Sequence, residues 1–128
     1  MYKNKTILAI VPARGNSKRI KNKNLKKIKG KTLVEHAGNI LKKISWIDYS
    51  IVSSDSAKII KSAKKSNLEC FFKRPKNISG DRIGDYTIIR HALKNFEKIK
   101  KKKIDIILLI QPTSCLLYTS PSPRDATL

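Results

Sequence analysis

The chain has 128 residues, of which 29 are Lys or Arg and nine are Asp or Glu, so its formal net charge is +20. This length suits one domain, or a piece of one, with a real hydrophobic core, and the longest apolar runs fall short of the roughly 20 residues that a membrane-spanning helix needs. The two cysteines indicate neither a disulfide framework nor a metal-ligand pair, which favours a cytoplasmic protein with no membrane association.

The strong positive charge has two interpretations. One is a nucleic-acid-binding module, because clustered cations bind phosphates. The other is genome composition, since Lys, Asn and Ile all have A/T-rich codons. The 23 lysines are scattered over the first 103 residues and only eight residues are aromatic, whereas binders of single-stranded nucleic acid interleave cations with aromatic side chains. We therefore favour a small-molecule function without nucleic acid and keep nucleic-acid binding as an alternative.

Strands and helices are predicted to alternate along the chain. Short apolar runs indicate buried strands, and apolar residues at a spacing of three to four indicate helices. This alternation predicts an α/β fold in which a mostly parallel sheet lies between helices. The last apolar run, IDIILLI, has the pattern of a strand covered on both faces. The strands are expected at residues 6–11, 49–53, 68–72 and 104–110, and the helices at residues 32–44, 56–66 and 83–99.

Polar segments follow each of the four predicted strands. Ligands of parallel α/β sheets bind beyond the carboxyl ends of the strands, so these segments are the candidates for a binding site. They comprise residues 11–24, 53–55, 74–75 and 111–114.

The first of these segments, VPARGNSKRIKNKN, has the composition of a phosphate-binding loop. Gly15 and Asn16 permit a tight turn that aims backbone N–H groups at an anion. Around them, Arg14, Ser17 and Lys23 add a hydroxyl and charges that can follow a polyphosphate. Neither a Walker A sequence nor a GxGxxG fingerprint is present. A basic surface turn in a lysine-rich chain would contain the same residues, so spacing alone leaves both interpretations open.

A family resemblance favours the phosphate loop. The stretch AIVPARGNSKRIKNKNL resembles the N-terminal signature of the acylneuraminate cytidylyltransferases, which make CMP-sialic acids and related CMP-activated sugar acids such as the legionaminic type. GKTLVEHA, IVSSD, FKRP and LLIQPTS resemble later segments of that family in the same order, over residues 5–114 in all. The resemblance implies a nucleotidyltransferase fold of Rossmann-like type and a homodimer. It also implies transfer of CMP from CTP, with Mg²⁺, to the anomeric hydroxyl of a nonulosonic acid, releasing pyrophosphate.

The resemblance also assigns roles within the first motif. Arg14 and Lys23 would be the catalytic residues, because their charges lie at the positions where the family contacts the phosphates of CTP. Ser17 would contact the same phosphates, and Asn24 would help to position the nucleotide. No metal ligand is assigned, because the family's magnesium-binding aspartates lie beyond the last resembling motif.

The resemblance also implies contacts with the base and with the sugar acid. Ala13 would offer backbone groups, and Arg74 its side chain, near the cytosine. Asp81 lies in a loop expected near the same site, although Arg74 and Asp81 could instead form an ordinary surface ion pair. The residues that would face the sugar acid are Gln111, Thr113 and Ser114.

Four other reactive or charged side chains are given structural roles. We expect Asp55 to cap the helix that starts at Ser56. His36 and His91 lie within helical patterns with no cysteine or carboxylate at metal-ligand spacing, so both are interpreted as packing or surface residues. Cys70 lies in a predicted apolar strand, where a thiol is usually buried and inert.

Residues 115–128 differ in composition from the rest of the chain. Residues 1–114 contain 50 Lys, Asn or Ile, whereas the tail contains none. The stretch CLLYTSPSPRD resembles the translation of a transposon-type sequencing adapter, and a natural Ser/Pro-rich linker is the less favoured interpretation. We therefore expect residues 1–114 to be the N-terminal part of a cytidylyltransferase domain, followed by a non-native, disordered tail. The chain as given is expected to be inactive. A 3-deoxy-manno-octulosonate-type cytidylyltransferase remains the alternative enzyme.

Overall fold

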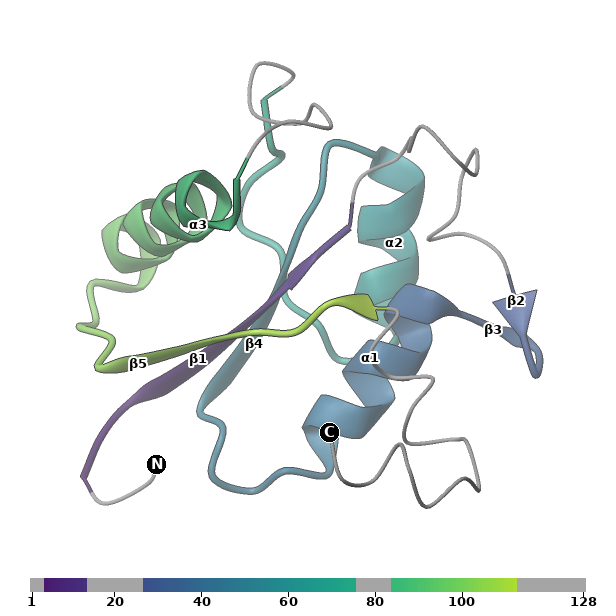
Figure 1. The fold of residues 1–128 in the computed structure, drawn as a ribbon, viewed down its shortest axis with the longest axis horizontal. Coiled ribbons are helices and arrows are strands. Elements are labelled where there is room, and N and C mark those ends of the chain that lie inside the picture. Colours follow the sequence, from purple (N-terminus) through teal and green to yellow (C-terminus); the bar gives the residue numbers. More distant parts are fainter. Residues whose placement is uncertain (1–3, 14–26, 76–83, 113–128) are drawn as a thin grey trace.

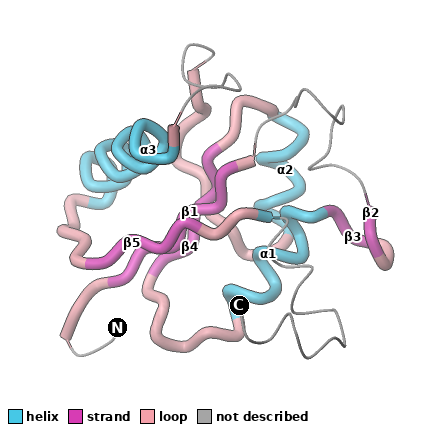
Figure 2. The backbone as a smooth tube through the Cα atoms, in the orientation of Figure 1, coloured by secondary structure: helices cyan, strands magenta, loops and turns pink. Residues whose placement is uncertain are grey.

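The computed structural model describes residues 4–13, 27–75 and 84–112. Its three main strands form a parallel sheet in the order β4-β1-β5, with α3 on one face and α1 and α2 on the other (Figures 1 and 2). This arrangement confirms the predicted α/β class. The main elements are β1 (Ile7–Pro12), α1 (Leu33–Lys42), β4 (Tyr49–Ser53), α2 (Ala57–Lys65), α3 (Asp85–Lys100) and β5 (Ile106–Leu109).

The central strand β1 explains why the first apolar run is continuous. Every residue of β1 is buried, because helices cover both faces of the sheet. Leu8 and Ile10 belong to the core on the α3 side, whereas Ala9 and Val11 belong to the core on the side of α1 and α2. The strand extends one residue beyond the predicted range, to Pro12, which pairs with the last residue of β4.

A capping box starts α1. The Thr32 hydroxyl accepts a hydrogen bond from the backbone N–H of Glu35 at 3.2 Å, and the Glu35 carboxylate accepts one from the Thr32 N–H at 3.4 Å. Each residue satisfies a donor that the first helical turn would otherwise leave without a partner. Four apolar residues of α1 are buried against the sheet and α2, namely Leu33, Val34, Ala37 and Leu41.

The same polar pair also joins α1 to α2. The Thr32 and Ser62 hydroxyls lie 2.9 Å apart, and the Ser62 hydroxyl donates to Glu35 Oε1 at 3.1 Å. Burial by itself raises the pKa of Glu35. The hydrogen bonds from Thr32 and Ser62, with the charge of Lys65, outweigh burial and bring this pKa below its ordinary value.

The two helices approach closely at Gly38. A Cβ atom at this position would collide with the backbone carbonyl oxygen of Ser66 and lie 2.9 Å from the Ser66 Cβ. The residue that follows α2 therefore needs a glycine on the facing surface of α1.

The start of α2 corrects one sequence-based prediction. The N-cap is Ser56, whose hydroxyl accepts a hydrogen bond from the Ile59 N–H at 3.4 Å, so the expected cap at Asp55 is wrong. Serine and aspartate are both strong N-cap residues, and the choice between neighbours depends on the backbone conformation. Here Ser56 has the extended backbone that an N-cap requires.

The predicted strand at residues 68–72 is replaced by a single parallel bridge between Glu69 and β4. Phe71 and Phe72 are neighbours, yet both pack in the core on the α3 side. Successive residues of a strand point to opposite faces, so this packing requires a non-strand backbone. Cys70 is half-buried rather than fully buried, and its thiol donates to the Phe72 carbonyl at 2.9 Å.

β5 is less covered than its apolar sequence predicts. Ile106 is 36% exposed and the other three residues are half-buried. Within the described ranges, β5 pairs only with β1, so its outer edge has no strand beside it. The expectation of a strand fully covered on both faces is therefore not met by these residues.

A short hairpin precedes α1 and was not expected from the sequence. β2 (Lys27–Ile28) and β3 (Lys31–Thr32) pair antiparallel across a two-residue turn. Lys29 and Gly30 both have positive φ, of 55° and 83°. Positive φ at both positions is the conformation of a type I′ hairpin turn, whose usual Asn-Gly or Asp-Gly signature is absent here.

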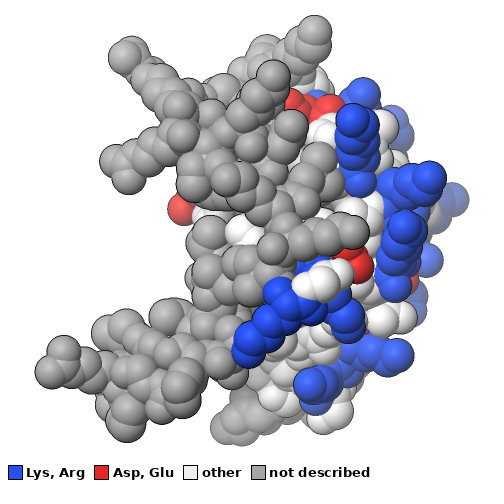
Figure 3. Space-filling view, turned by 90° about the vertical axis from the view of Figure 1, so that its right-hand side faces the viewer, with Lys and Arg blue, Asp and Glu red and all other residues white. Residues whose placement is uncertain are grey.

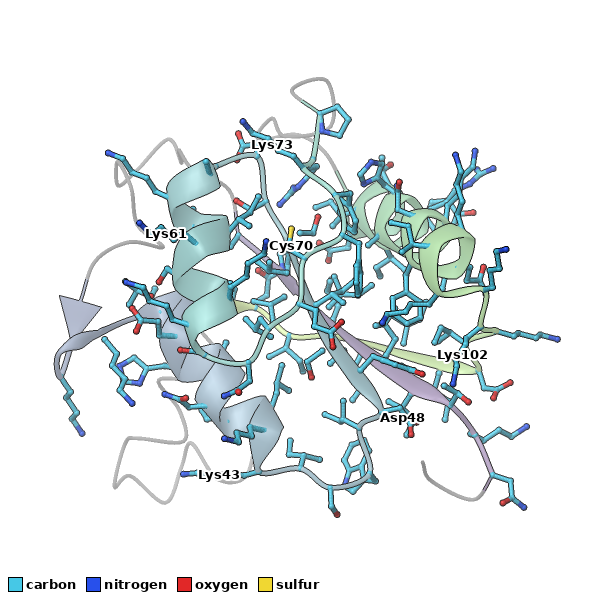
Figure 4. All side chains as sticks on the ribbon, turned by 180° about the vertical axis from the view of Figure 1, so that it is seen from behind. Lys43, Asp48, Lys61, Cys70, Lys73 and Lys102 are labelled. Atoms are coloured by element: carbon cyan, nitrogen blue, oxygen red, sulfur yellow. The ribbon has the colours of Figure 1, made fainter. Side chains whose placement is uncertain are left out.

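Asp48 and Lys102 lie at the amino end of the sheet, away from the strand ends that follow β1 and β4 (Figure 4). The Asp48 carboxylate accepts a hydrogen bond from the Ile7 N–H at 2.7 Å, and Lys102 lies at the same end (Figure 4). The Lys102 ammonium group is 5.9 Å from the centre of the Tyr49 ring.

Among the helices of the described ranges, none combines the length and apolar character needed to cross a membrane.

Lys side chains gather on the side of the molecule that carries α2 and the β2–β3 hairpin (Figure 3). This surface follows from the pattern of α2, whose apolar residues face the core and whose lysines face solvent. The exposed lysines of these elements are Lys29, Lys31, Lys58, Lys61, Lys64 and Lys65.

Candidate functional site

The carboxyl ends of β1 and β4 are tied together by one backbone oxygen. The Ala13 N–H, directly after β1, donates to the carbonyl of Ser53, the last residue of β4, at 2.9 Å. Ala13 is only 1% exposed. On the other side of β1, the chain leaves β5 through Ile110, whose N–H donates to the Ile10 carbonyl at 2.9 Å. The exposed Gln111 follows directly. Three of the predicted site segments, those after β1, β4 and β5, therefore begin at the same edge of the sheet.

Arg74 lies at this edge and is 2% exposed. Its backbone N–H donates to the Ser54 carbonyl at 2.7 Å, and its Nη2 donates to the Ser53 carbonyl at 2.8 Å. The same Ser53 oxygen therefore accepts from both Ala13 and Arg74. The alternative prediction placed Arg74 in an ion pair with Asp81 on the surface. It is wrong about the surface position, because Arg74 is buried, and Asp81 lies outside the described residues. A buried cation needs such fixed acceptors, since it has lost most of its water.

The serines after β4 shape the start of α2 at the same edge. The Ser54 hydroxyl accepts a hydrogen bond from the Ser56 N–H at 3.1 Å, and the Ser56 hydroxyl caps the helix. The first turn of a helix presents N–H groups and a partial positive charge. Together with Arg74, the N-terminus of α2 makes this end of the sheet electropositive and suited to an anionic ligand.

His91 lies on α3, on the opposite side of the sheet from α2. Its ring packs edge-on against the Phe72 ring, with centroids 4.9 Å apart. Its Nδ1 is buried and has no hydrogen-bond partner. Burial lowers the pKa of the His91 imidazole, and the positive charge of Arg74 lowers it further. The Ser53 hydroxyl is likewise buried without a hydrogen-bond partner.

Sequence reasoning placed His91 among packing residues and gave the Ser53 side chain no role. The side on which each of these two side chains lies could have been predicted from the periodicity of the sequence. Ser53 alternates with Tyr49 and Ile51, which places its side chain on the α3 face. His91 stands three residues after the buried Ile88, on the inner side of α3. Neither pattern could show that the Ser53 carbonyl would bind Arg74 or that His91 would pack against Phe72.

The structure brings together two of the predicted nucleotide-binding residues, Ala13 and Arg74, and places Gln111 on the neighbouring strand end. Among the described residues, no three His, Cys, Asp or Glu side chains are grouped so as to hold a metal ion. The other predicted residues lie outside the described ranges, namely Arg14, Ser17, Lys23, Asn24, Asp81, Thr113 and Ser114.

Comparison with known proteins gives related sequences of one kind. CMP-N,N′-diacetyllegionaminic acid synthase of Campylobacter jejuni is 33% identical over 92 residues, which are 72% of this chain and 39% of that protein. Pseudaminic acid cytidylyltransferase of Campylobacter jejuni is 34% identical over 114 residues, covering 89% of this chain and 46% of that protein. The chain thus spans less than half the length of these relatives.

A solved structure has the same fold. The structure of CMP:2-keto-3-deoxy-manno-octonic acid synthetase complexed with CTP matches with a TM-score of 0.63 at 18% identity, over 84% of this chain and 40% of that chain. The family described as cytidylyltransferase matches residues 8–121, which includes the start of the compositionally distinct tail. The predicted boundary at residue 114 therefore stays a prediction. Because this family match covers most of the sequence, the chain belongs to the cytidylyltransferase family.

Proposed function

We propose that the protein containing this chain transfers CMP from CTP to the anomeric hydroxyl of a nonulosonic acid and releases pyrophosphate. The observation that carries the proposal is the convergence of Ala13 and Arg74 on the Ser53 carbonyl at the end of a parallel sheet. Both residues occupy motif positions where the family contacts the nucleotide. The two Campylobacter relatives are named for legionaminic and pseudaminic acids, and these names support the substrate class.

The reaction asks the protein mainly for positioning and positive charge. The anomeric oxygen attacks the α-phosphorus, a new phosphorus–oxygen bond forms, and the bond to the bridging oxygen breaks. Pyrophosphate leaves with that electron pair, and the hydroxyl proton passes to a base. We propose that Arg14 and Lys23, with the Ser17 hydroxyl, stabilise the charge that develops on the phosphates. Asn24 is proposed to position the nucleotide.

Arg74 is the described residue best placed to recognise the base. A guanidinium donates hydrogen bonds only, and cytosine offers two adjacent acceptors, its ring carbonyl and N3. Uracil carries a hydrogen on N3, so one of these acceptors becomes a donor that faces Arg74. We propose that Arg74, with backbone groups of Ala13, favours CTP over UTP for this reason.

Gln111, Thr113 and Ser114 are proposed to contact the sugar acid, as the QPTS motif suggests. The family resemblance alone supports a homodimeric, cytoplasmic protein that requires Mg²⁺. No step of the reaction is assigned to the metal. A 3-deoxy-manno-octulosonate-type activity is less favoured, since likeness to that synthetase at 18% identity shows the fold alone.

An assay of pyrophosphate release tests the proposal. A longer protein that carries residues 1–114 within a complete family domain is incubated with CTP, Mg²⁺ and one acceptor at a time. The acceptors are sialic, legionaminic and pseudaminic acids and 3-deoxy-manno-octulosonate. We expect release with at least one nonulosonic acid and much less with UTP in place of CTP. Two results would contradict the proposed substrate class. One is release with 3-deoxy-manno-octulosonate but with none of the nonulosonic acids, and the other is no release with any of the four acceptors.

A further inference from the structure

A cavity of about 710 Å³ is lined by residues of the β2–β3 hairpin and of α1. Four of its seven lining residues are lysines, and none of these seven is acidic. The hairpin supplies Lys29 and Lys31, whereas Lys42 and Lys43 come from the end of α1, and all four are exposed. The volume falls within the roughly 300–1,000 Å³ that is usual for small-molecule sites. The cavity therefore has the size of a ligand site and a strongly cationic wall.

The α1 wall of the cavity is a face of the helix that the core does not use. His36, Asn39, Ile40 and Lys43 line the cavity at successive spacings of three or four residues, so they form one stripe along the helix. The buried residues of α1 lie on another side. Glu35, the acid of this helix, is bound to the hydroxyls of its neighbours in the network between α1 and α2. Its charge is thus used in that network and not in the cavity.

The gathering of four lysines has a cost in free energy, because like charges close together repel one another. The helix dipole explains Lys42 and Lys43, since cations are favourable at the C-terminus of a helix. It does not explain the two lysines of the hairpin. Lys29 has a φ of 55°, a left-handed conformation that Asn or Gly adopts at lower cost. Formation of the turn therefore gives no reason for a lysine at this position.

The high lysine content of the chain does not by itself produce such a cavity. A second cavity, of about 470 Å³, is lined by one lysine, Lys64, one acid, Glu69, and four uncharged residues. The charges of that second cavity balance. An excess of cations without an acid is thus a property of the cavity beside the hairpin.

We propose that the cavity between the hairpin and α1 binds an oligophosphate, a molecule with two or three linked phosphate groups. Lysine acts as a compact point charge that suits phosphates, whereas planar carboxylates favour arginine. Linked phosphates bring several negative charges close together, which matches the four lysines. His36 and Asn39 add groups that can donate hydrogen bonds to phosphate oxygens. The cavity shares no lining residue with the strand ends at Ala13, Arg74 and Gln111, so the proposal does not depend on the proposed function.

The two histidines of the chain give a direct test, because only His36 lines the cavity and His91 packs against Phe72 on the other side of the sheet. Inorganic tripolyphosphate is titrated into the 128-residue chain at about 0.15 M salt, and the ring signals of both histidines are followed by NMR. We expect the His36 signals to shift and saturate while the His91 signals stay constant. Sodium sulfate at equal ionic strength should not reproduce the shift. Constant His36 signals, or equal shifts of both histidines, would overturn the proposal.

A pair of double variants separates the cavity from the net charge. Lys29→Gln/Lys43→Gln removes two charges from the cavity, and Lys58→Gln/Lys61→Gln removes two from the exposed face of α2. Figure 4 shows Lys61 well apart from Lys43. The affinity for tripolyphosphate, measured from the His36 signals, should fall about fivefold or more in the cavity variant. The control should lose less than about twofold, because salt screens charges outside the cavity. Equal losses would mean that net charge alone attracts the ligand, which would overturn the site.

A third double variant distinguishes the cavity from the proposed phosphate loop. Arg14→Ala/Lys23→Ala should keep the shift of the His36 signals, because neither residue lines the cavity. Loss of the shift in this variant, together with its retention in Lys29→Gln/Lys43→Gln, would assign the ligand to the loop and overturn the cavity site. The proposed function fails or holds separately, in the assay of pyrophosphate release.

The source of the phosphates is identified with the same loop variant. Tripolyphosphate, ATP and CTP are titrated into Arg14→Ala/Lys23→Ala in turn, again with His36 as the reporter. Similar affinities for the three would support a site for the triphosphate chain, whichever molecule carries it. Binding of tripolyphosphate without either nucleotide would support a site for inorganic oligophosphate. Binding of none of the three would overturn the proposal.

Discussion

Arg74 Nη2 donates a hydrogen bond of 2.8 Å to the carbonyl oxygen of Ser53, 21 residues earlier in the chain. That oxygen also accepts from the Ala13 N–H at 2.9 Å. Segments that follow β1, β4 and the bridge at Glu69 are therefore joined at one atom. A change in the position of Arg74 must affect the geometry of the other two segments.

Arg74→Lys is expected to weaken this junction although it keeps the charge. A lysine ammonium cannot reproduce the planar arrangement of guanidinium donors at the same place. We expect the free energy of unfolding, measured with urea, to fall by about 1–3 kcal/mol, the cost of disturbing a buried hydrogen bond to a charged group. Lys73→Ala, at an exposed neighbouring position, should change it by about 0.5 kcal/mol at most. Equal stability of the two variants would count against the junction.

Gly38→Ala tests the close approach of α1 and α2. Alanine usually stabilises a helix by about 1 kcal/mol relative to glycine. Here its methyl group would meet the Ser66 carbonyl oxygen, so we expect a net loss of about 1–3 kcal/mol in the free energy of unfolding. Asn39→Ala is the matched control, because it improves helix propensity in the same helix without that collision. A stabilised Gly38→Ala would show that the helices can move apart at little cost.

Glu35→Gln tests the polar network between α1 and α2. The pKa of Glu35 is lower when the protein is folded, so its charge stabilises the fold above the unfolded pKa of about 4.3. That stabilisation is lost as the pH falls through the folded pKa. We expect Glu35→Gln to reduce the free energy of unfolding by about 0.5–1 kcal/mol at neutral pH.

The pH dependence separates charge from packing at this position. The difference between Glu35→Gln and the unmodified chain should shrink in acid, where both side chains are neutral. Glu69→Gln, at an exposed position, is the control. Urea unfolding of all three proteins at neutral and acidic pH gives the comparison. If the difference in the free energy of unfolding between Glu35→Gln and the unmodified chain is the same at both pH values, the charge of Glu35 is not its cause.

Arg14→Ala and Lys23→Ala test the proposed phosphate contacts in the longer active protein. Each should lower kcat/KM by about 100-fold or more, the usual scale for losing a preorganised contact to developing charge. Lys61→Ala removes a charge from the exposed side of α2 and should leave kcat/KM nearly unchanged (Figure 4). Full activity in both loop variants would refute the assignment of residues 11–24 to the phosphates.

Deletion of residues 115–128 tests the proposed non-native tail. Because this segment contains no Lys, Asn or Ile, which together make up 50 of residues 1–114, we expect its removal to leave thermal stability unchanged. The measurement is the midpoint of thermal unfolding with and without the segment. A decrease of more than about 3 °C, which corresponds to roughly 0.5 kcal/mol for a chain of this size, would make the segment part of the fold.

Local signals predicted most of the secondary structure. The strand at residues 49–53 lies where the sequence predicts it, and helices occur at all three ranges where the sequence predicts them. The failure at residues 68–72 has a tertiary cause, because Phe71 and Phe72 both turn toward α3. Apolar composition cannot distinguish such a segment from a strand, since both bury the same residues.

The site was predicted less completely than the fold. Family motifs identified Ala13 and Arg74, and the structure places both beside the Ser53 carbonyl. His91 comes from a helix that carries no motif for it, and its contact with Phe72 arises only when α3 packs on the sheet. Contacts of this kind depend on the tertiary arrangement, so a single sequence gives no direct signal for them.

The outer edge of β5 has a consequence for handling the chain in solution. An apolar strand without a neighbour can pair with the same strand of another copy. The net charge of +20 opposes that encounter, but about 0.1 M salt reduces the range of such repulsion to about 10 Å. We therefore expect the purified chain to remain monomeric longest at low ionic strength. Added salt should make its solutions turbid rather than clear.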